Sequence, residues 1–207
     1  SDTQNIPASN FVEKGWRLGD PSEFIWVGKT DDWNEPTNWD YGTVPTPGKP
    51  VKIPTGLTNY PVLDTDINLI DETADIKEDS LIIETGAEIN FAGNKFSVTK
   101  FENFGEVEFK GGSIFSTSIN NSGIVILTGK EEISGEISES GTVIYSGTET
   151  DAKFSWGSNY KNLEIQDDFS GSFENGVIVS DSLKIVNGFE ITEKLDNSKN
   201  LLEISGT

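Results

Sequence analysis

The sequence contains no cysteine, no histidine and no methionine, and its only arginine is Arg17. Without cysteine the chain has no disulfide, no thiolate metal site and no cysteine nucleophile. Without histidine it lacks the commonest general base and the commonest transition-metal ligand. Enzymes that act on anionic substrates usually hold them with several arginines. These absences predict a protein that is not a conventional enzyme, and they leave its cellular compartment open.

Positive charge is also scarce, since 35 acidic side chains are set against 15 basic ones and the net charge is −20. Such a field repels nucleic acids and anionic membrane surfaces, because both carry dense negative charge. No apolar run approaches the roughly 18 residues that a membrane-spanning helix needs. We therefore expect neither nucleic-acid binding nor membrane insertion by this chain. The simplest interpretation of the acidic excess is a solvated surface.

A repeat of 18 residues occupies the middle of the chain. Each unit has a small residue, then two apolar residues at alternating positions, then a glycine, as in 123–129. This alternation is typical of a strand with one buried face, and the glycines allow sharp corners. A short strand that recurs at fixed register predicts a β-solenoid, in which each coil buries its apolar face against its neighbours. The expected ladders are Ile89, Val107, Val125 and Val143, and Phe91, Phe109, Leu127 and Tyr145.

The handedness of the solenoid can be argued from the hexapeptide rule. A left-handed β-helix needs an aliphatic residue at every sixth position, and this frame places Ser113 and Glu131 at such positions. We therefore expect a right-handed parallel β-helix. Asn103 and Asn121 fall at one corner, and their side chains could form an amide ladder. Alternatively they are plain turn residues that tolerate unusual φ angles, and turn chemistry favours this second interpretation.

Beyond residue 150 the repeat loosens, with candidate strands at 163–165, 177–179, 183–185, 189–191 and 202–204. The chain lacks an initial methionine and stops in mid-repeat, where a bare sheet edge would stay unpaired. We therefore expect a mature or engineered piece of a longer chain. The predicted organisation is an N-terminal extension over 1–23, an aromatic N-terminal cap over 24–75, and β-helix coils over 76–207, with the 18-residue repeat clearest over 87–158.

Residues 24–63 are rich in tryptophan, tyrosine and proline, and the prolines exclude helix and interrupt strands. The rings could close the apolar end of the solenoid, because solenoid ends need caps. They could instead form a platform that stacks on sugar rings. The position just before the first coil favours the cap, which buried rings would support, whereas exposed rings would support sugar binding. The candidate sugar-binding residues are Trp33, Trp39, Tyr41 and Tyr60.

Acidic residues are the only candidate metal ligands that stand out. Calcium takes six to eight hard oxygen ligands, and the spacing here matches neither an EF-hand nor a glycine-aspartate repeat. Solvated loop residues are the simpler interpretation, and we expect no cofactor other than this possible calcium. The best candidate calcium ligands are Asp64, Asp66, Asp71 and Asp75.

Several motifs resemble those of a known group of proteins when they are taken in order. They lie at 26–28, 33–34, 38–39, 44–45, 51–54 and 58–63 in the aromatic region, and at 120–129, 141–148 and 160–165 in the repeats. In this order they resemble large β-helix surface proteins of Bacteroidetes and spirochaetes, which are similar to filamentous haemagglutinin-type adhesins. The resemblance implies a right-handed β-helix, extracellular display and adhesion. It carries over no catalytic residue.

We therefore expect a non-catalytic domain for adhesion or structural display at a bacterial cell surface. Its partner would be a host or matrix protein or a surface glycan. The alternative is a carbohydrate-binding module or a part of a polysaccharide-processing protein, since parallel β-helices also carry such enzymes. Among 35 acidic residues some pair will meet the carboxylate spacing of a glycosidase, so that spacing and the fold do not by themselves predict catalysis.

Overall fold

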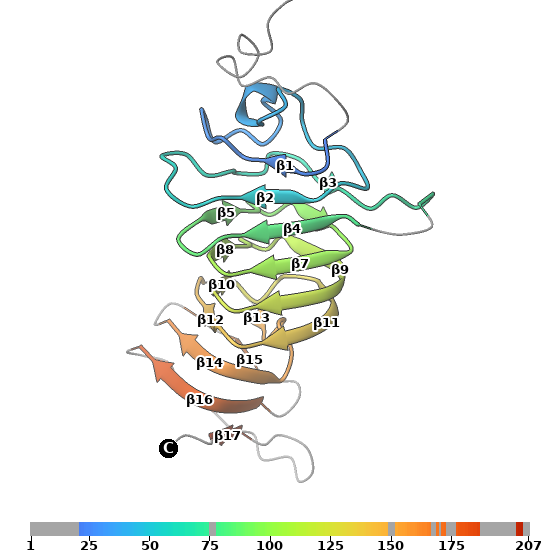
Figure 1. Ribbon diagram of the computed structural model, residues 1–207. Coiled ribbons are helices and arrows are strands. Elements are labelled where there is room, and N and C mark those ends of the chain that lie inside the picture. Colours follow the sequence, from blue (N-terminus) through green and yellow to red (C-terminus); the bar gives the residue numbers. More distant parts are fainter. Residues whose placement is uncertain are drawn as a thin grey trace, which may run out of the picture.

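The computed structural model describes residues 21–74, 78–148, 152–166, 169, 171–172, 177–186 and 202–204. In this part of the chain short strands wind into a column, and the single helical turn is η1 (Pro36–Asn38) (Figure 1). The predicted all-β solenoid is confirmed. The strands are β1 (Phe24–Ile25), β2 (Val51–Ile53), β3 (Ile67–Asn68), β4 (Ser80–Ile83), β5 (Glu88–Asn90), β6 (Lys95–Ser97), β7 (Lys100–Asn103), β8 (Glu106–Glu108), β9 (Ser113–Asn121), β10 (Ile124–Leu127), β11 (Ile133–Glu139), β12 (Thr142–Tyr145), β13 (Ala152–Lys153), β14 (Asn159–Ile165), β15 (Gly171–Ser172), β16 (Val177–Ile185) and β17 (Leu202–Ile204).

Every named pair of strands is parallel, as expected when each coil lies on the one before it. One sheet has the order β1-β2-β4-β7-β9-β6-β3, with β11 also paired to β9. The second sheet has the order β17-β16-β14-β12-β10-β8-β5, and β13 pairs with β15 in a small third sheet. Strands far apart in sequence thus become neighbours. We call the second of these sheets the seven-stranded sheet.

The 18-residue register predicted from the sequence is confirmed in the seven-stranded sheet. Val125 pairs with Val107 on one side and with Val143 on the other. After β12 the step lengthens to 20 residues, because Val143 pairs with Leu163 and Leu163 with Leu183. Pairing fixes register only within the strands, so the connections absorb the difference. This is why the repeat loosens beyond residue 150 although the ladder continues.

The expected late strands agree with the structure where it describes them. Residues 163–165 lie in β14, and residues 202–204 form β17. The candidate strands at 177–179 and 183–185 are both parts of the single strand β16. The candidate strand at 189–191 lies outside the described residues.

Two columns of glycine serve different purposes. Gly93, Gly111, Gly129 and Gly147 all have positive φ, as expected for glycines at sharp corners. Gly123 has ordinary φ, but a Cβ built on it would lie 2.1 Å from the carbonyl oxygen of Gly105. Gly141 meets the carbonyl of Gly123 in the same way, at 2.2 Å. This second column therefore exists because successive backbones approach too closely for a side chain.

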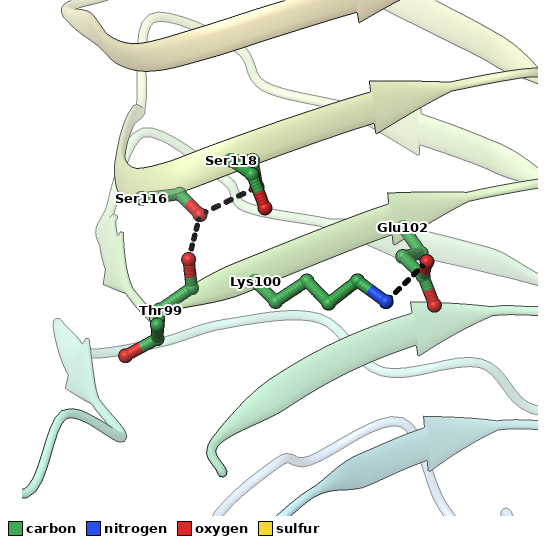
Figure 2. Close-up of polar contacts among 5 residues, drawn as sticks. All are labelled: Thr99, Lys100, Glu102, Ser116 and Ser118. Atoms are coloured by element: carbon green, nitrogen blue, oxygen red, sulfur yellow. Dashed lines mark hydrogen bonds and ion pairs between the residues drawn. The ribbon is translucent and has the colours of Figure 1, made fainter. Parts of the chain in front are cut away.

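At another corner, two separate strands of one coil pair with a single continuous strand of the next coil. Residues of β6 and β7 pair with the two halves of the continuous strand β9. The hydroxyl of Ser116 lies 2.9 Å from the carbonyl oxygen of Thr99 and 2.8 Å from that of Ser118 (Figure 2). Beside this bend, Lys100 and Glu102 form an ion pair at 2.8 Å. The single hydroxyl proton of Ser116 can donate to either of these two carbonyl oxygens at the bend.

The aromatic segment is joined to the coils by backbone pairing. β1 pairs with β2 and β2 with β4, so this segment begins the first sheet. Val62 bridges to Asn90 of β5 and to Asp32 in parallel fashion, which extends the seven-stranded sheet in the N-terminal direction. The predicted boundary at 75–76 and residues 1–20 of the predicted extension over 1–23 lie outside the described residues.

Candidate functional site

The two tryptophans proposed to stack on sugars are buried. Trp33 is 1% exposed and Trp39 is 2% exposed. Their ring centroids lie 4.8 Å apart, and the indole nitrogen of Trp39 donates to the carbonyl of Trp33 at 2.9 Å. Trp33 also meets the ring of Phe96 in β6 edge-on, at 5.5 Å. Sugar stacking needs an open ring face, so in this structure neither indole can provide the predicted platform.

The two tyrosines of the predicted sugar site are half-buried and contact different parts of the chain. Tyr41 packs edge-on against Phe24 of β1, with centroids 5.9 Å apart. The hydroxyl of Tyr60 donates to the carbonyl of Gly86 at 3.0 Å. Tyr60 also lines a cleft of about 310 Å³, together with side chains of β5 and β8. Of the four predicted sugar-binding residues, Tyr60 is therefore the one placed at a described cleft.

The predicted calcium ligands make separate contacts. Asp64 accepts a hydrogen bond from the Asn34 amide at 2.6 Å, and Asp66 accepts from the backbone amide of Lys95 at 2.9 Å. Asp71 accepts from both the amide and the hydroxyl of Thr73, at 2.8 and 2.7 Å. Among the residues that the structure describes, no three acidic side chains gather as a metal site would require. Asp75 lies outside the described residues.

The outward face of the seven-stranded sheet carries both apolar and acidic side chains. Register places Ile124 beside Glu106, and Ile126 beside Glu108. Ile126 is in turn paired with Ile144 of β12. These side chains alternate with the inward ladder and are part-exposed. We name the three isoleucines the isoleucine patch: Ile124, Ile126 and Ile144.

The acidic side chains beside the patch repel one another. Burial raises the pKa of Glu106, and the negative charges of Glu88 and Glu108 raise it further. Glu108 is partly compensated, because it forms an ion pair with Lys110 at 3.1 Å and accepts from the Asn90 amide at 2.5 Å. All three glutamates line the cleft that Tyr60 borders. This end of the sheet therefore favours a ligand or partner that brings positive charge or hydrogen-bond donors.

The corner asparagines form a buried ladder, which corrects our preference for plain turn residues. The amide of Asn103 donates to Oδ1 of Asn121 at 2.8 Å, and both side chains are wholly buried. The amide of Asn121 then donates to both carboxylate oxygens of Glu139 at 3.0 Å. The physical reason is burial: an amide enclosed at a corner must find partners, and the next coil presents an identical group.

The ladder ends at a second cleft, of about 430 Å³, between β11 and β14. Glu139 lines this cleft and accepts from the amide of Gly141 and the indole nitrogen of Trp156, each at 2.7 Å. Burial raises the pKa of Glu139, although these donors and Asn121 act in the opposite direction. Both oxygens are occupied by protein donors, so the carboxylate serves the fold. The spacing of Asn103, Asn121 and Glu139 was visible in the sequence, whereas nothing there indicated Trp156.

No protein-family model, no curated protein and no solved structure matches this chain. Among the described residues, no helix is both long and apolar enough to cross a membrane. The functional argument therefore depends on the surface of the solenoid itself.

Proposed function

We propose that this chain is a non-catalytic domain for adhesion or structural display at a bacterial cell surface, built on a right-handed β-helix with an aromatic N-terminal cap. The observation that carries the proposal is the outward face of the seven-stranded sheet. Parallel pairing aligns its side chains in columns, as for Glu88, Glu106 and Ile124. Stacked repeats of this kind form extended and rigid contact surfaces, which suit the binding of a large partner.

The cap proposal is supported by contacts at the N-terminal end. Trp33 lies one residue beyond the bridge between Asp32 and Val62, in line with the inward side chains of the sheet. Trp26 packs against both Trp33 and Trp39, with centroids 6.5 and 5.0 Å apart. An aromatic layer of this kind shields from water the apolar side chains of the first coil at the N-terminal end.

The test of adhesion is an array of glycans and host matrix proteins, probed with the folded chain in the presence and absence of calcium. We expect binding to at least one matrix protein, and we expect that binding to survive Tyr60→Ala. An array with no matrix-protein signal in either condition would contradict the adhesion proposal. Circular dichroism of the variant establishes that the chain remains folded.

A second candidate function is carbohydrate binding at the cleft that Tyr60 borders. Half-exposed aromatic rings stack on sugars, and carboxylates and amides bind sugar hydroxyls. The cleft combines Tyr60 with Asn59, Asn90 and the three glutamates of β5 and β8. This candidate predicts a glycan signal that Tyr60→Ala abolishes. Phe104→Ala is the matched control, because Phe104 is an exposed aromatic residue away from this cleft.

A further inference from the structure

The isoleucine patch is an apolar area in the middle of an outward sheet face. Ile126 and Ile144 are direct partners on neighbouring strands, and Ile124 lies two residues before Ile126 on the same side. Thr142, the partner of Ile124, adds a methyl group to this surface. The inward ladder supplies the core of these coils, and the three isoleucines are not among its buried residues. Apolar groups gathered on an outward face indicate a contact surface.

Acidic side chains border the patch on both sides along the solenoid. Glu106 and Glu108 of β8 adjoin Ile124 and Ile126. On the other side Glu164 of β14 adjoins Ile144, and Lys184 of β16 pairs with Glu164 at 2.9 Å, so the negative charge is concentrated on the β8 side. Burial raises the pKa of Glu106, and the negative charges of Glu88 and Glu108 raise it further, so a nearby cation would favour the ionised carboxylate. An apolar centre with an acidic border is complementary to an apolar segment with basic flanks.

The charge of the chain decides among the possible occupants. A second copy would bring another chain of net charge −20, and an anionic membrane would be repelled in the same way. We propose that the isoleucine patch docks a segment of another protein whose apolar side chains are flanked by lysine or arginine. This inference rests on the proposed function, since it names the partner chemistry and the contact residues of that same surface.

The probe is a fluorescent synthetic peptide with a central Leu-Val-Leu segment and three lysines at each end. Two comparison peptides replace either the apolar centre with serine or the lysines with glutamate. Fluorescence anisotropy is measured with the whole chain at low and at high ionic strength. We expect binding of the first peptide only, weakened by salt, because basic flanks and an apolar centre are both required.

Two sets of variants locate the contact. The double variant Ile126→Thr/Ile144→Thr keeps β-branching and should weaken binding about tenfold. The double variant Glu106→Gln/Glu108→Gln should weaken binding about threefold and reduce its salt dependence. The controls are Ile82→Thr, on the outward side of β4 in the other sheet, and Glu136→Gln, on the exposed side of β11. Both controls should bind like the parent chain.

Any of four results would overturn the inference: no binding of the first peptide, equal binding of the glutamate peptide, equal binding of the lysine–serine peptide, or unchanged binding by the isoleucine double variant. Equal binding of the lysine–serine peptide would mean that the surface attracts cations only. A matrix-protein signal on the array that persists in the isoleucine double variant would leave adhesion standing and place its contact elsewhere. The two proposals therefore fail separately.

Discussion

The side-chain amide of Asn103 donates to that of Asn121, 2.8 Å away and one coil further along the solenoid. Each side chain in this ladder also accepts the backbone amide of the glycine two residues ahead. These bonds measure 3.0 Å for Asn103 to Gly105 and 3.2 Å for Asn121 to Gly123. The ladder therefore links the polar side chains of successive coils to the glycine column in which successive backbones approach closely.

Replacing the middle member of the ladder should be costly. Asn121→Leu removes the partner of Asn103 and of Glu139, and leaves buried donors and a carboxylate with fewer bonds. We expect the free energy of unfolding to fall by about 2–4 kcal/mol, measured by urea denaturation. Asn120→Ala, at the neighbouring outward position, should change it by less than about 0.5 kcal/mol. Equal effects of the two variants would contradict a structural role for the ladder.

The glycine column should not tolerate a methyl group. Gly123→Ala would place Cβ against the carbonyl oxygen of Gly105, so the coils must separate. We expect a loss of about 3 kcal/mol or more in thermal or chemical denaturation. Gly56→Ala has open space around its Cβ but a positive φ of 80°, and should cost only about 1 kcal/mol. If Gly123→Ala were the milder change, close backbone approach would not be the reason for this glycine.

The stability of the chain should depend on pH through Glu106, whose pKa is raised above 4.5 by burial and by Glu88 and Glu108. A carboxyl group with a higher pKa in the folded chain binds more protons when folded. Its stabilising contribution is present below about pH 4.5 and is lost as the pH rises through the folded pKa. Glu106→Gln cannot ionise, so this variant should become more stable than the parent above that range.

The measurement is urea denaturation of both proteins from about pH 4 to pH 7, where the gap should open with rising pH. Glu136→Gln removes the same charge from the exposed side of β11 and controls for the change in net charge. A gap of equal size for both variants would assign the effect to the total charge of the chain and not to the acidic neighbours of Glu106.

The aromatic layer should stabilise the solenoid. Trp33→Ala removes a buried ring that contacts Trp39 and Phe96, and should lower the free energy of unfolding by about 3–5 kcal/mol. Val27→Ala, at an exposed position of the same segment, should cost about 0.5 kcal/mol or less. Urea denaturation followed by circular dichroism measures both. A fully stable Trp33→Ala variant would contradict the proposed cap.

The fold was predictable from the sequence over the regular repeats and less so on either side. Ile89, Val107, Val125 and Val143 recur at equal spacing, and stacking alone brings such residues together. Between Val51 and its partner Leu81 the step is 30 residues, and no spacing in the sequence marks that pair. The register across such long connections cannot be predicted from sequence spacing, because only the backbone pairing at their two ends determines it.

The candidate surface was only partly predictable. Tyr60 was identified from its aromatic neighbours, but its proximity to Glu106 comes from the bridge between Val62 and Asn90. The outward position of Ile126 follows from the alternation that buries Val125, yet its pairing with Ile144 beside Glu164 requires the observed register. A local pattern can tell which way a side chain faces, whereas its neighbours on other coils depend on the path of the connections.

The sequence by itself determined the all-β class, the 18-residue coil and the inward ladders, because a strand with period two and a fixed repeat has few ways to bury its apolar side. Only the tertiary structure decided that Trp33 and Trp39 are buried and that Asn103 and Asn121 bond to each other. Aromatic rings and amides suit both water and a core, and the coils stacked around them determine which environment they meet.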